Sequence, residues 1–294
     1  MFTELLTALT GSPSTVVAAT VTPDAVTIEV IGAQLADEDT IFEVASITKV
    51  FTVMTAVSLQ HEGALSLDDS LVDTWDGAPD IPLHQLANHT SGLKRLPPNM
   101  DRKYLKAHEE QPYAVYTRAL LGEGVSQAKP KKAGKVRYSN FGMGLLGETL
   151  AVVTGQPYEE LVTQHVLEPL GMTNTGFTAE PLQPRNRKGE PVPAWDFDAL
   201  AGAGALRSNV TDMATFVRWW MDPQEPFTLM LEQSLGWQKA EGFIWHNGAT
   251  YGSASFIGVD MENEVGVVML SNVPDPLGLT ITTTGFKAME RLRP

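Results

Sequence analysis

Hydrophobic and polar positions in the first sixty residues predict a β-hairpin followed by a buried helix. Residues 14–33, STVVAATVTPDAVTIEVIGA, contain two β-branched runs on either side of a Thr-Pro-Asp-Ala turn, which is typical of two paired strands. From Ser46 to about Gln60, apolar residues occupy nearly every face, and the glycine of HEG (61–63) supplies a stop. We therefore expect a hairpin and then a helix surrounded by protein.

The rest of the pattern places helices in the middle of the chain and strands near its end. From about Leu65 to Leu235, helical periodicity is interrupted by loops rich in proline and glycine, such as GLKRLPPN and EPLQPRNRKGEPVP. Three strand-like runs follow: EGFIWHNGAT, SASFIGVDME and EVGVVMLSNV. A final amphipathic segment, ITTTGFKAMERL, predicts a terminal helix.

Strands at both ends with helices between them predict an α+β fold. The simplest packing joins the terminal strands into one antiparallel sheet flanked by helices, so that residues 1–64 and 236–294 form an α/β lobe. Residues 65–235 then form a mainly helical lobe. A cleft between the two lobes is where a ligand site is expected.

Composition and charge narrow the range of partners. A hydrophobic content of 43% and a charged content of 19% are those of a soluble globular protein. The net charge of −14 argues against binding to nucleic acid or to an anionic membrane, because both would repel the chain. The absence of cysteine excludes a disulfide framework and a thiolate nucleophile. The N-terminus lacks the basic region of a signal peptide and the chain lacks a long apolar run, so a cytoplasmic location is expected. The oligomeric state is left open.

A serine three residues before a lysine is the first candidate for chemistry. Ser-x-x-Lys occurs three times, as Ser46/Lys49, Ser91/Lys94 and Ser126/Lys129. The second and third pairs fall among glycines and prolines and are expected in loops. Only the first opens a convincing helix, where residues three apart are neighbours and the helix dipole favours a developing negative charge.

Burial would give Lys49 a function. Desolvation lowers the pKa of a lysine, and a neutral amine beside a hydroxyl can take its proton and make it a nucleophile. The alternative is structural: Ser46 caps the helix and Lys49 extends its ammonium group to water.

Two further motifs favour the catalytic interpretation. RYSNFG contains Tyr138-Ser139-Asn140, the only Tyr-x-Asn in the chain. WHNGAT contains His246-Asn247-Gly248 inside a predicted strand. The other matches to His/Lys-x-Gly, HEG and KAG, fall at a helix end and in a loop.

These three motifs, in this order, resemble the serine β-lactamase and penicillin-binding-protein superfamily. The Tyr-x-Asn form resembles its class C β-lactamase branch, which includes family VIII esterases and DD-peptidases. Other stretches also look like this branch: HTSGL (89–93), LLGETLAVVTG (145–155), EPLGMTNTGF (168–177) and AGAGALRSNVTDMATF (201–216). The resemblance runs from about residue 41 to 272 and implies a β-lactamase/transpeptidase-like fold.

The resemblance also implies a role for each motif residue. Ser46 would attack a carbonyl and form an acyl-enzyme, with Lys49 taking its proton. Tyr138 would be the second base and acid, its phenolate favoured by a nearby ammonium group. Asn140 would hydrogen-bond Lys49 and the acyl side chain of the substrate, and it could also cap a helix that begins at Phe141.

On the strand, the backbone N–H groups of Ser46 and Ala249 would form the oxyanion hole. Gly248 would leave room for substrate lying edge-on to this strand. Together with Asn247, His246 would bind substrate, although β-lactamases of this branch usually have Lys-Thr-Gly here. A mostly neutral histidine weakens the case for a substrate with an obligatory carboxylate.

The sequence carries no sign of a metal or cofactor. The remaining histidines have no metal-ligand spacing, and His89 belongs to the HTSGL turn. No Gly-x-Ser-x-Gly or Walker motif occurs. The basic stretch KPKKAGKVR (129–137) could attract an anionic substrate or simply be a solvated loop.

We therefore expect a serine hydrolase that needs no cofactor and acts on small carboxylic esters or amides. One alternative is a β-lactamase or D-Ala-D-Ala carboxypeptidase/D-aminopeptidase, which would turn over a β-lactam or be acylated by it. The other is a penicillin-binding-like sensor without turnover.

Overall fold

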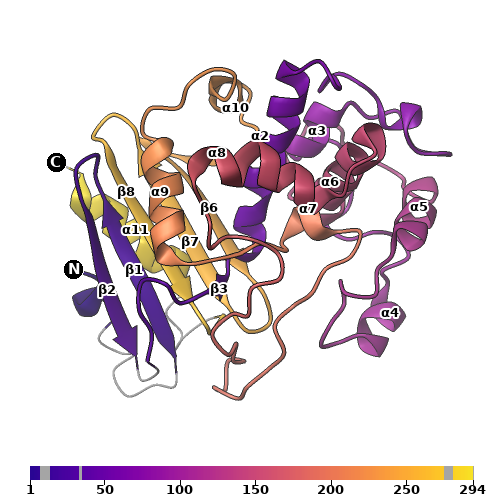
Figure 1. Ribbon diagram of the computed structural model, residues 1–294. Coiled ribbons are helices and arrows are strands. Elements are labelled where there is room, and N and C mark those ends of the chain that lie inside the picture. The colour runs from indigo at the N-terminus through magenta and orange to yellow at the C-terminus, as the bar shows by residue number, and fades with distance from the viewer. Residues whose placement is uncertain (7–13, 33–34, 275–280, 294) are drawn as a thin grey trace.

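The computed structural model describes residues 1–6, 14–32, 35–274 and 281–293 of the chain. The structure has a sheet on one side and most of the helices on the other (Figure 1). The described helices are α1 (Phe2–Leu5), α2 (Thr48–His61), α3 (Leu83–Ala87), α4 (Arg102–Ala107), α5 (Arg118–Ser126), α6 (Asn140–Thr154), α7 (Tyr158–Val162), α8 (Glu168–Leu170), α9 (Val210–Trp219), α10 (Thr228–Glu232) and α11 (Ile281–Leu292). The described strands are β1 (Thr15–Val21), β2 (Val26–Gly32), β3 (Phe42–Glu43), β4 (Arg207–Ser208), β5 (Gln238–Ala240), β6 (Phe243–Ala249), β7 (Ala254–Asp260) and β8 (Val265–Ser271).

The main sheet joins strands from the two ends of the chain. Its order is β2-β1-β8-β7-β6-β5, and every neighbouring pair is antiparallel. Strand β1 lies between β2 and β8, with Val16 opposite Ile31 on one side and Ser271 on the other. The predicted α+β fold and its single antiparallel sheet are confirmed. The hairpin expected over residues 14–33 is β1 and β2, and residue 33 lies outside the described residues.

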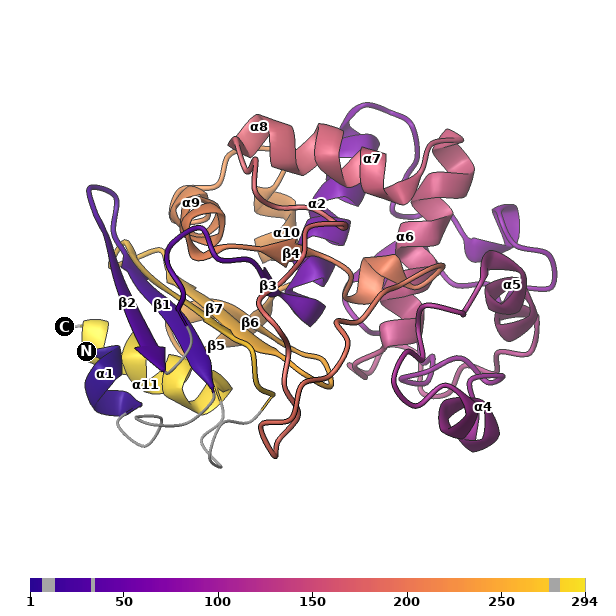
Figure 2. The same ribbon diagram turned by 60° about the horizontal axis from the view of Figure 1, so that its bottom comes forward.

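Helices α9 and α11 cover opposite faces of this sheet (Figures 1 and 2). Helix α11 packs on β7 and β8, whereas α9 packs on β1 and β8. A side chain at Gly266 would collide with Val217 of α9 at 2.2 Å, which shows how closely that helix approaches. The placement of α9 in a helical lobe spanning residues 65–235 is therefore corrected, because an apolar helix face packs wherever it finds an apolar surface. The proposed lobe boundaries otherwise stay a prediction.

Helix α2 runs through the centre of the molecule and is buried on nearly every side, as its sequence predicts. Phe51 stacks on Phe216 of α9 at 4.2 Å between ring centroids. One residue further on, Thr52 contacts the hydroxyl of Tyr158 in α7 at 2.8 Å. Because α2 is held from both sides, the residues at its start have fixed positions. Of the two other Ser-x-x-Lys pairs, Ser91/Lys94 lies in a loop, but Ser126 is the last residue of α5 instead of a loop residue.

None of the helices in the described ranges combines the length and apolarity needed to cross a membrane. The cytoplasmic location stays a prediction.

Candidate active site

Ser46 and Lys49 lie within hydrogen-bonding distance at the start of α2. Ser46 sits in a 3₁₀ turn, Ala45–Ile47, that leads directly into α2. Lys49 Nζ donates to Ser46 Oγ at 2.9 Å and to the carbonyl of Ala203 at 2.5 Å. The i to i+3 spacing therefore brings amine and hydroxyl together as the sequence predicts, and the carbonyl of Ala203 fixes the amine from the other side.

The surroundings of Lys49 favour its neutral form. Its side chain is wholly buried (0% exposed), and its two hydrogen-bond partners are uncharged. Burial holds the pKa of Lys49 well below its usual range, and the positive charge of Arg95 lowers it further. A neutral amine facing a serine hydroxyl can accept its proton.

The backbone just before Ser46 is strained. Ala45 adopts a φ of 48°, in the left-handed region that residues other than glycine rarely enter. The side chain of Thr48 donates to the Ala45 carbonyl at 2.6 Å, and the N–H of Leu206 donates to Thr48 Oγ1 at 3.0 Å. The surrounding contacts thus hold a conformation that the local sequence does not favour, as is common at functional sites.

Tyr138 lies against both Ser46 and Lys49. The side chain of Ser46 interacts with its hydroxyl and lowers its pKa, and Lys49 Nζ lies 4.9 Å from the centre of its ring. Burial nevertheless raises the pKa of Tyr138 to about 12, although the bond to Ser46 and the charge of Arg95 act in the opposite direction. Burial therefore favours the phenol form of Tyr138 near neutral pH, and the expectation of a phenolate stabilised by an ammonium group stays a prediction.

Asn140 is near these residues but does not make the bond that was expected. Its Nδ2 donates to the hydroxyl of Tyr113 at 3.0 Å, while its buried Oδ1 has no partner among the described residues. Lys49 uses Ser46 and Ala203 instead. The cap of α6 is also different: Ser139 Oγ accepts from the N–H of Gly142 at 2.8 Å, and Asn140 is the first helical residue. The side-chain carbonyl of Asn140 is thus left as an acceptor for a ligand.

Gly248 allows β6 to approach the serine turn closely. A Cβ at this position would lie 2.2 Å from the carbonyl oxygen of Val44 and 2.9 Å from the backbone nitrogen of Ser46. The glycine was expected to make room for substrate, but it is the protein's own backbone that occupies this space. Its absence of a side chain brings β6 against the N–H of Ser46.

The edge of β6 beyond Trp245 is open. Strand β5 pairs only with residues 243–245, so among the described strands none covers the outer edge of residues 246–249. At the other edge, which faces β7, the N–H of Thr250 donates to the carbonyl of Ser253. N–H groups alternate in direction along an antiparallel strand, so the N–H of Ala249 points to the open edge. This arrangement suits the predicted oxyanion hole of Ser46 and Ala249.

His246 and Asn247 point to opposite faces of the sheet, as neighbours on a strand must. His246 is wholly buried near Tyr138, with a separation of 6.4 Å between ring centroids. Burial lowers the pKa of His246 to about 3, and any positive charge on nearby Lys49 or His89 would lower it further, so the neutral ring is favoured. Asn247 donates to Thr282 of α11 at 2.8 Å, so its amide is turned away from Ser46. Asn247 would therefore bind substrate through its backbone and not through its side chain.

Glu43 connects the two segments that carry the candidate oxyanion donors. This buried carboxylate accepts hydrogen bonds from Ser253 at 2.6 Å and from Thr250 at 3.1 Å, directly after Ala249. It also accepts from the N–H of Trp195 at 2.8 Å. Burial raises the pKa of Glu43 despite these bonds. Glu43 is therefore a positioning residue, because it ties the strand before Ser46 to the turn that follows β6.

Three residues at this site were missed or undervalued by the sequence analysis. His89 lies 4.6 Å from Tyr138 between ring centroids, and its Nδ1 accepts from the N–H of Ser139 at 3.3 Å. The guanidinium carbon of Arg95 lies 5.3 Å from the centre of the same ring, and Tyr113 binds Asn140. HTSGL marked the position of His89 but gave only a structural role. Neither Arg95 nor Tyr113 belongs to a motif, so nothing in the sequence indicated them.

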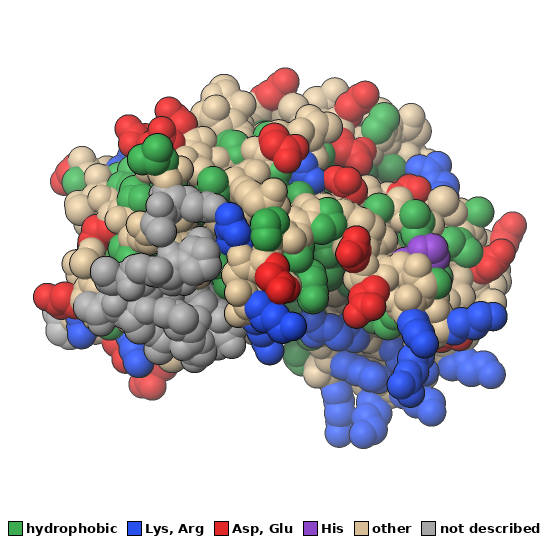
Figure 3. Space-filling model, turned by 90° about the horizontal axis from the view of Figure 1, so that it is seen from below, with side chains coloured by type: hydrophobic (Ala, Val, Ile, Leu, Met, Phe, Trp, Pro, Cys, Tyr) green, Lys and Arg blue, Asp and Glu red, His purple; other side chains and the backbone are tan. Residues whose placement is uncertain are grey.

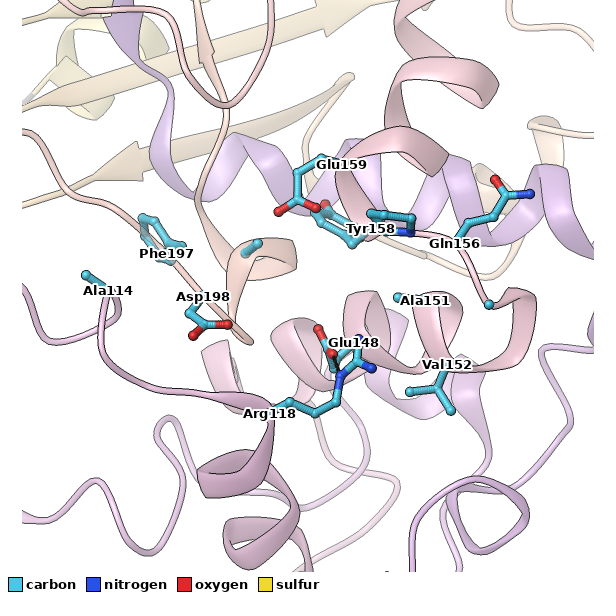
Figure 4. Close-up of a pocket in the computed structure, with 13 residues that line it drawn as sticks. Ala114, Arg118, Glu148, Ala151, Val152, Gln156, Tyr158, Glu159, Phe197 and Asp198 are labelled. Atoms are coloured by element: carbon cyan, nitrogen blue, oxygen red, sulfur yellow. Dashed lines mark hydrogen bonds and ion pairs between the residues drawn. The ribbon is translucent and has the colours of Figure 1, made fainter.

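Two pockets lie in this part of the molecule. One, of about 310 Å³, is next to Tyr138 and is also lined by His89, Val136, Trp237 and Gln238. A larger one, of about 800 Å³, lies behind the turn that carries Ala203 and is lined by Tyr158 and the ion pair of Arg118 with Glu148 (Figure 4). Its lining includes none of Ser46, Lys49 and Tyr138, whereas the smaller pocket is lined by Tyr138 but not by Ser46 or Lys49. In the described ranges, no group of three or more His, Cys, Asp or Glu residues is arranged to hold a metal ion.

Comparison with known proteins identifies the family and the fold. The family model described as Beta-lactamase matches residues 2–286. D-alanyl-D-alanine-carboxypeptidase/endopeptidase AmpH of Escherichia coli (strain K12) is 34% identical over 196 residues, which are 62% of this chain and 48% of that protein. Protein flp of Staphylococcus aureus (strain MW2) is 24% identical over 278 residues, 81% of this chain and 54% of that protein. The chain thus spans about half the length of the curated relatives it matches.

Solved structures share the whole fold. A class C beta-lactamase superposes with a TM-score of 0.79 at 21% identity, over 99% of this chain and 95% of that one. A Beta-Lactamase/D-Alanine Carboxypeptidase from Pseudomonas syringae also gives 0.79, at 19% identity over 99% and 97% of the two chains. The β-lactamase/transpeptidase-like fold is thereby confirmed.

The fold and the family model agree: the chain belongs to the Beta-lactamase family.

Proposed function

We propose that the protein hydrolyses small carboxylic esters or amides through an acyl-enzyme on Ser46. The observation that carries the proposal is the contact of 2.9 Å between Lys49 Nζ and Ser46 Oγ, made by an amine with no exposed surface. An amine in this environment takes the serine proton without first having to shed a hydration shell.

The proposed reaction follows from the positions of these groups. Lys49 accepts the proton of Ser46 as Oγ bonds to the substrate carbonyl carbon. The carbonyl oxygen becomes an oxyanion held by the N–H groups of Ser46 and Ala249. Tyr138, whose phenol hydroxyl interacts with Ser46, donates its proton to the leaving alkoxide or amine and regains one from Lys49. Water then attacks the acyl-enzyme by the reverse use of the same groups, which releases the acid and restores Ser46.

On the side of the site formed by β6, the residues favour a substrate without a charged leaving group. His246 is buried and uncharged, so β6 offers no cation to a carboxylate on the leaving group. The similarity to AmpH favours the alternative, a D-alanyl-D-alanine-carboxypeptidase or a β-lactamase. A protein of the same fold that only binds such compounds is the third possibility.

Turnover of a short-chain p-nitrophenyl ester and of a chromogenic cephalosporin distinguishes these possibilities. We expect kcat/KM for the ester to exceed that for the cephalosporin by about 100-fold or more, because β6 lacks a cation for the cephalosporin carboxylate. The Ser46→Ala protein gives the background rate for both compounds. Preferential cleavage of the cephalosporin would contradict the proposal and support a β-lactamase, and equal silence on both would support a binding protein.

A further inference from the structure

The positive charge of this acidic protein is concentrated beside the proposed active site. Residues 94–137 hold 11 of the 21 Lys and Arg residues but only 4 of the 35 acidic ones. This stretch therefore carries a net charge of +7, and the rest of the chain carries −21. Figure 3 shows Lys and Arg side chains gathered at one end of the molecule. A charge separation of this size creates a local field that attracts anions despite the net charge of −14.

The part of this stretch nearest to Ser46 is held in place. Residues 129–137 run along the HTSGL turn, where the N–H groups of Lys131, Gly134 and Arg137 donate to the carbonyls of Gly92, Thr90 and His89 at 2.9, 2.8 and 2.7 Å. A side chain at Gly92 would collide with the backbone of Lys131 at 2.8 Å, so the two segments are in close contact. We name the exposed cations of these paired segments the basic rim: Lys94, Arg95, Lys129, Lys131, Lys132, Lys135 and Arg137.

Arg95 is the member of the basic rim that reaches the reacting groups. Its guanidinium carbon lies 5.3 Å from the ring centre of Tyr138, and its charge acts on Lys49 and Tyr113 as well. Its side chain is exposed, and no carboxylate among the described residues forms an ion pair with it. The other basic side chains at this point, Lys49, His89 and His246, are buried or half-buried, and burial lowers the pKa of each. Arg95 is thus an exposed cation, without an ion-pair partner among the described residues, beside basic groups whose surroundings favour their neutral forms.

The backbone of Arg95 indicates which end of a substrate this cation would meet. Its carbonyl accepts from the N–H of Phe141 at 3.0 Å, so Arg95 adjoins Asn140 on the helical side of Ser46. Asn140 Oδ1 is buried and has no partner among the described residues, so it can accept a hydrogen bond from the acyl chain of a substrate placed on this side.

From this arrangement we infer that the substrate carries an anionic group on its acyl portion and that Arg95 is the residue that selects it. The inference rests on the proposed function, which it extends from small esters in general to acyl donors with a distal carboxylate or comparable anion. The rest of the basic rim raises the local concentration of such substrates. A guanidinium can hold a carboxylate through two parallel hydrogen bonds, which a lysine cannot do.

Two matched esters test the inference: mono-p-nitrophenyl adipate and p-nitrophenyl hexanoate, which differ by the distal carboxylate. We expect the wild type to show the higher kcat/KM for the adipate. In Arg95→Gln the ratio of the two values should fall about tenfold or more, since a hydrogen bond to a charged group is lost. The ratio cancels any effect of Arg95 on Lys49 itself. The matched control is Lys287→Gln, which removes an exposed cation from α11 on the other face of the sheet and should leave the ratio unchanged.

The position of the charge is tested with 4-(hexanoyloxy)benzoate, which carries a carboxylate on the leaving group. If Arg95→Gln lowers kcat/KM for 4-(hexanoyloxy)benzoate but not for mono-p-nitrophenyl adipate, the assignment of Arg95 to the acyl side would be overturned. A wild-type ratio near one, or a ratio that Arg95→Gln does not change, would overturn the inference as a whole.

Equilibrium binding of the adipate monoester to Ser46→Ala protein separates this inference from the proposed function. We expect Ser46→Ala to bind it about tenfold or more tightly than the double variant Ser46→Ala/Arg95→Gln. If the wild type turns over neither ester but this difference is found, the proposed function fails and the anion site stands. If the difference is absent, the anion site is wrong whatever the rate of turnover.

Discussion

Replacing Lys49 by arginine is expected to lower kcat/KM for a p-nitrophenyl ester about 1,000-fold or more, the size of a general-base contribution. Arginine keeps a positive charge and hydrogen-bond donors, but it cannot lose its proton in a protein. A lysine that served only as a cation would thus be replaced with modest loss. The comparison distinguishes a base from a charge because the wild type and Lys49→Arg can both donate to Ser46.

Lys49→Met is the companion variant, because buried arginine can disturb the fold. Methionine fills a similar volume without an amine, so the protein should remain folded while activity falls by the same factor of about 1,000. Circular dichroism and thermal unfolding check the fold, and initial rates check the activity. Retention of more than about a tenth of wild-type kcat/KM by either variant would show that Lys49 is not the base.

The pH dependence follows from the direction of the Lys49 pKa. Burial lowers the pKa of Lys49 well below its ordinary value of 10.5, so the neutral base is present at correspondingly lower pH. Activity should rise with pH as Lys49 loses its proton and reach half its maximum well below pH 10.5. Between the folded and unfolded pKa values the unfolded chain binds the additional proton, so the free energy of unfolding also rises with pH in that window. Lys49→Met should remove both dependences.

The second large effect is expected from Gly248→Ala. The added methyl group would lie 2.2 Å from the Val44 carbonyl, 2.5 Å from Ser255 Oγ and 2.9 Å from Ser46 N. Two of these atoms are backbone, so β6 and the serine turn must move apart. We expect a loss of about 1–3 kcal/mol in the free energy of unfolding. We also expect a 10²- to 10³-fold fall in kcat, roughly the cost of removing one oxyanion donor.

Gly176→Ala is the matched control for this substitution. No heavy atom lies within 4 Å of a Cβ built at Gly176, and its φ is not in the left-handed range. Chemical denaturation and ester turnover of both variants give the comparison. A Gly248→Ala protein as stable and active as Gly176→Ala would mean that the close approach of β6 to Ser46 has no consequence for the site.

The sequence predicts the site well where the chemistry depends on neighbours along one element. Ser46 and Lys49 are three residues apart on one turn, so their contact follows from helix geometry. The hairpin, the central helix and the three late strands follow in the same way from hydrophobic period. For His246 the sequence predicts a mostly neutral ring, and burial lowers its pKa further.

Features that depend on segments far apart in the chain were missed or explained wrongly. Gly248 was assigned to substrate, because the approach of Val44 and Ser46 to β6 cannot be read from either segment alone. The protonation state of Tyr138 could not be read from the sequence for a related reason: it depends on burial and on the charge of the neighbouring amine. Arg95 reaches the Tyr138 ring only because residues 91–98 fold over it, and no pattern in an exposed loop indicates such a contact.

The central claim is that Ser46 carries the acyl group, and intact-protein mass spectrometry tests it most directly. Wild type and Ser46→Ala are mixed with a p-nitrophenyl ester, quenched in acid within the first turnovers, weighed and digested. The account predicts a mass increase equal to the acyl group in the wild type, confined to the peptide that contains Ser46 and absent from Ser46→Ala. An acyl group on any other residue, or ester turnover by Ser46→Ala at the wild-type rate, would contradict it.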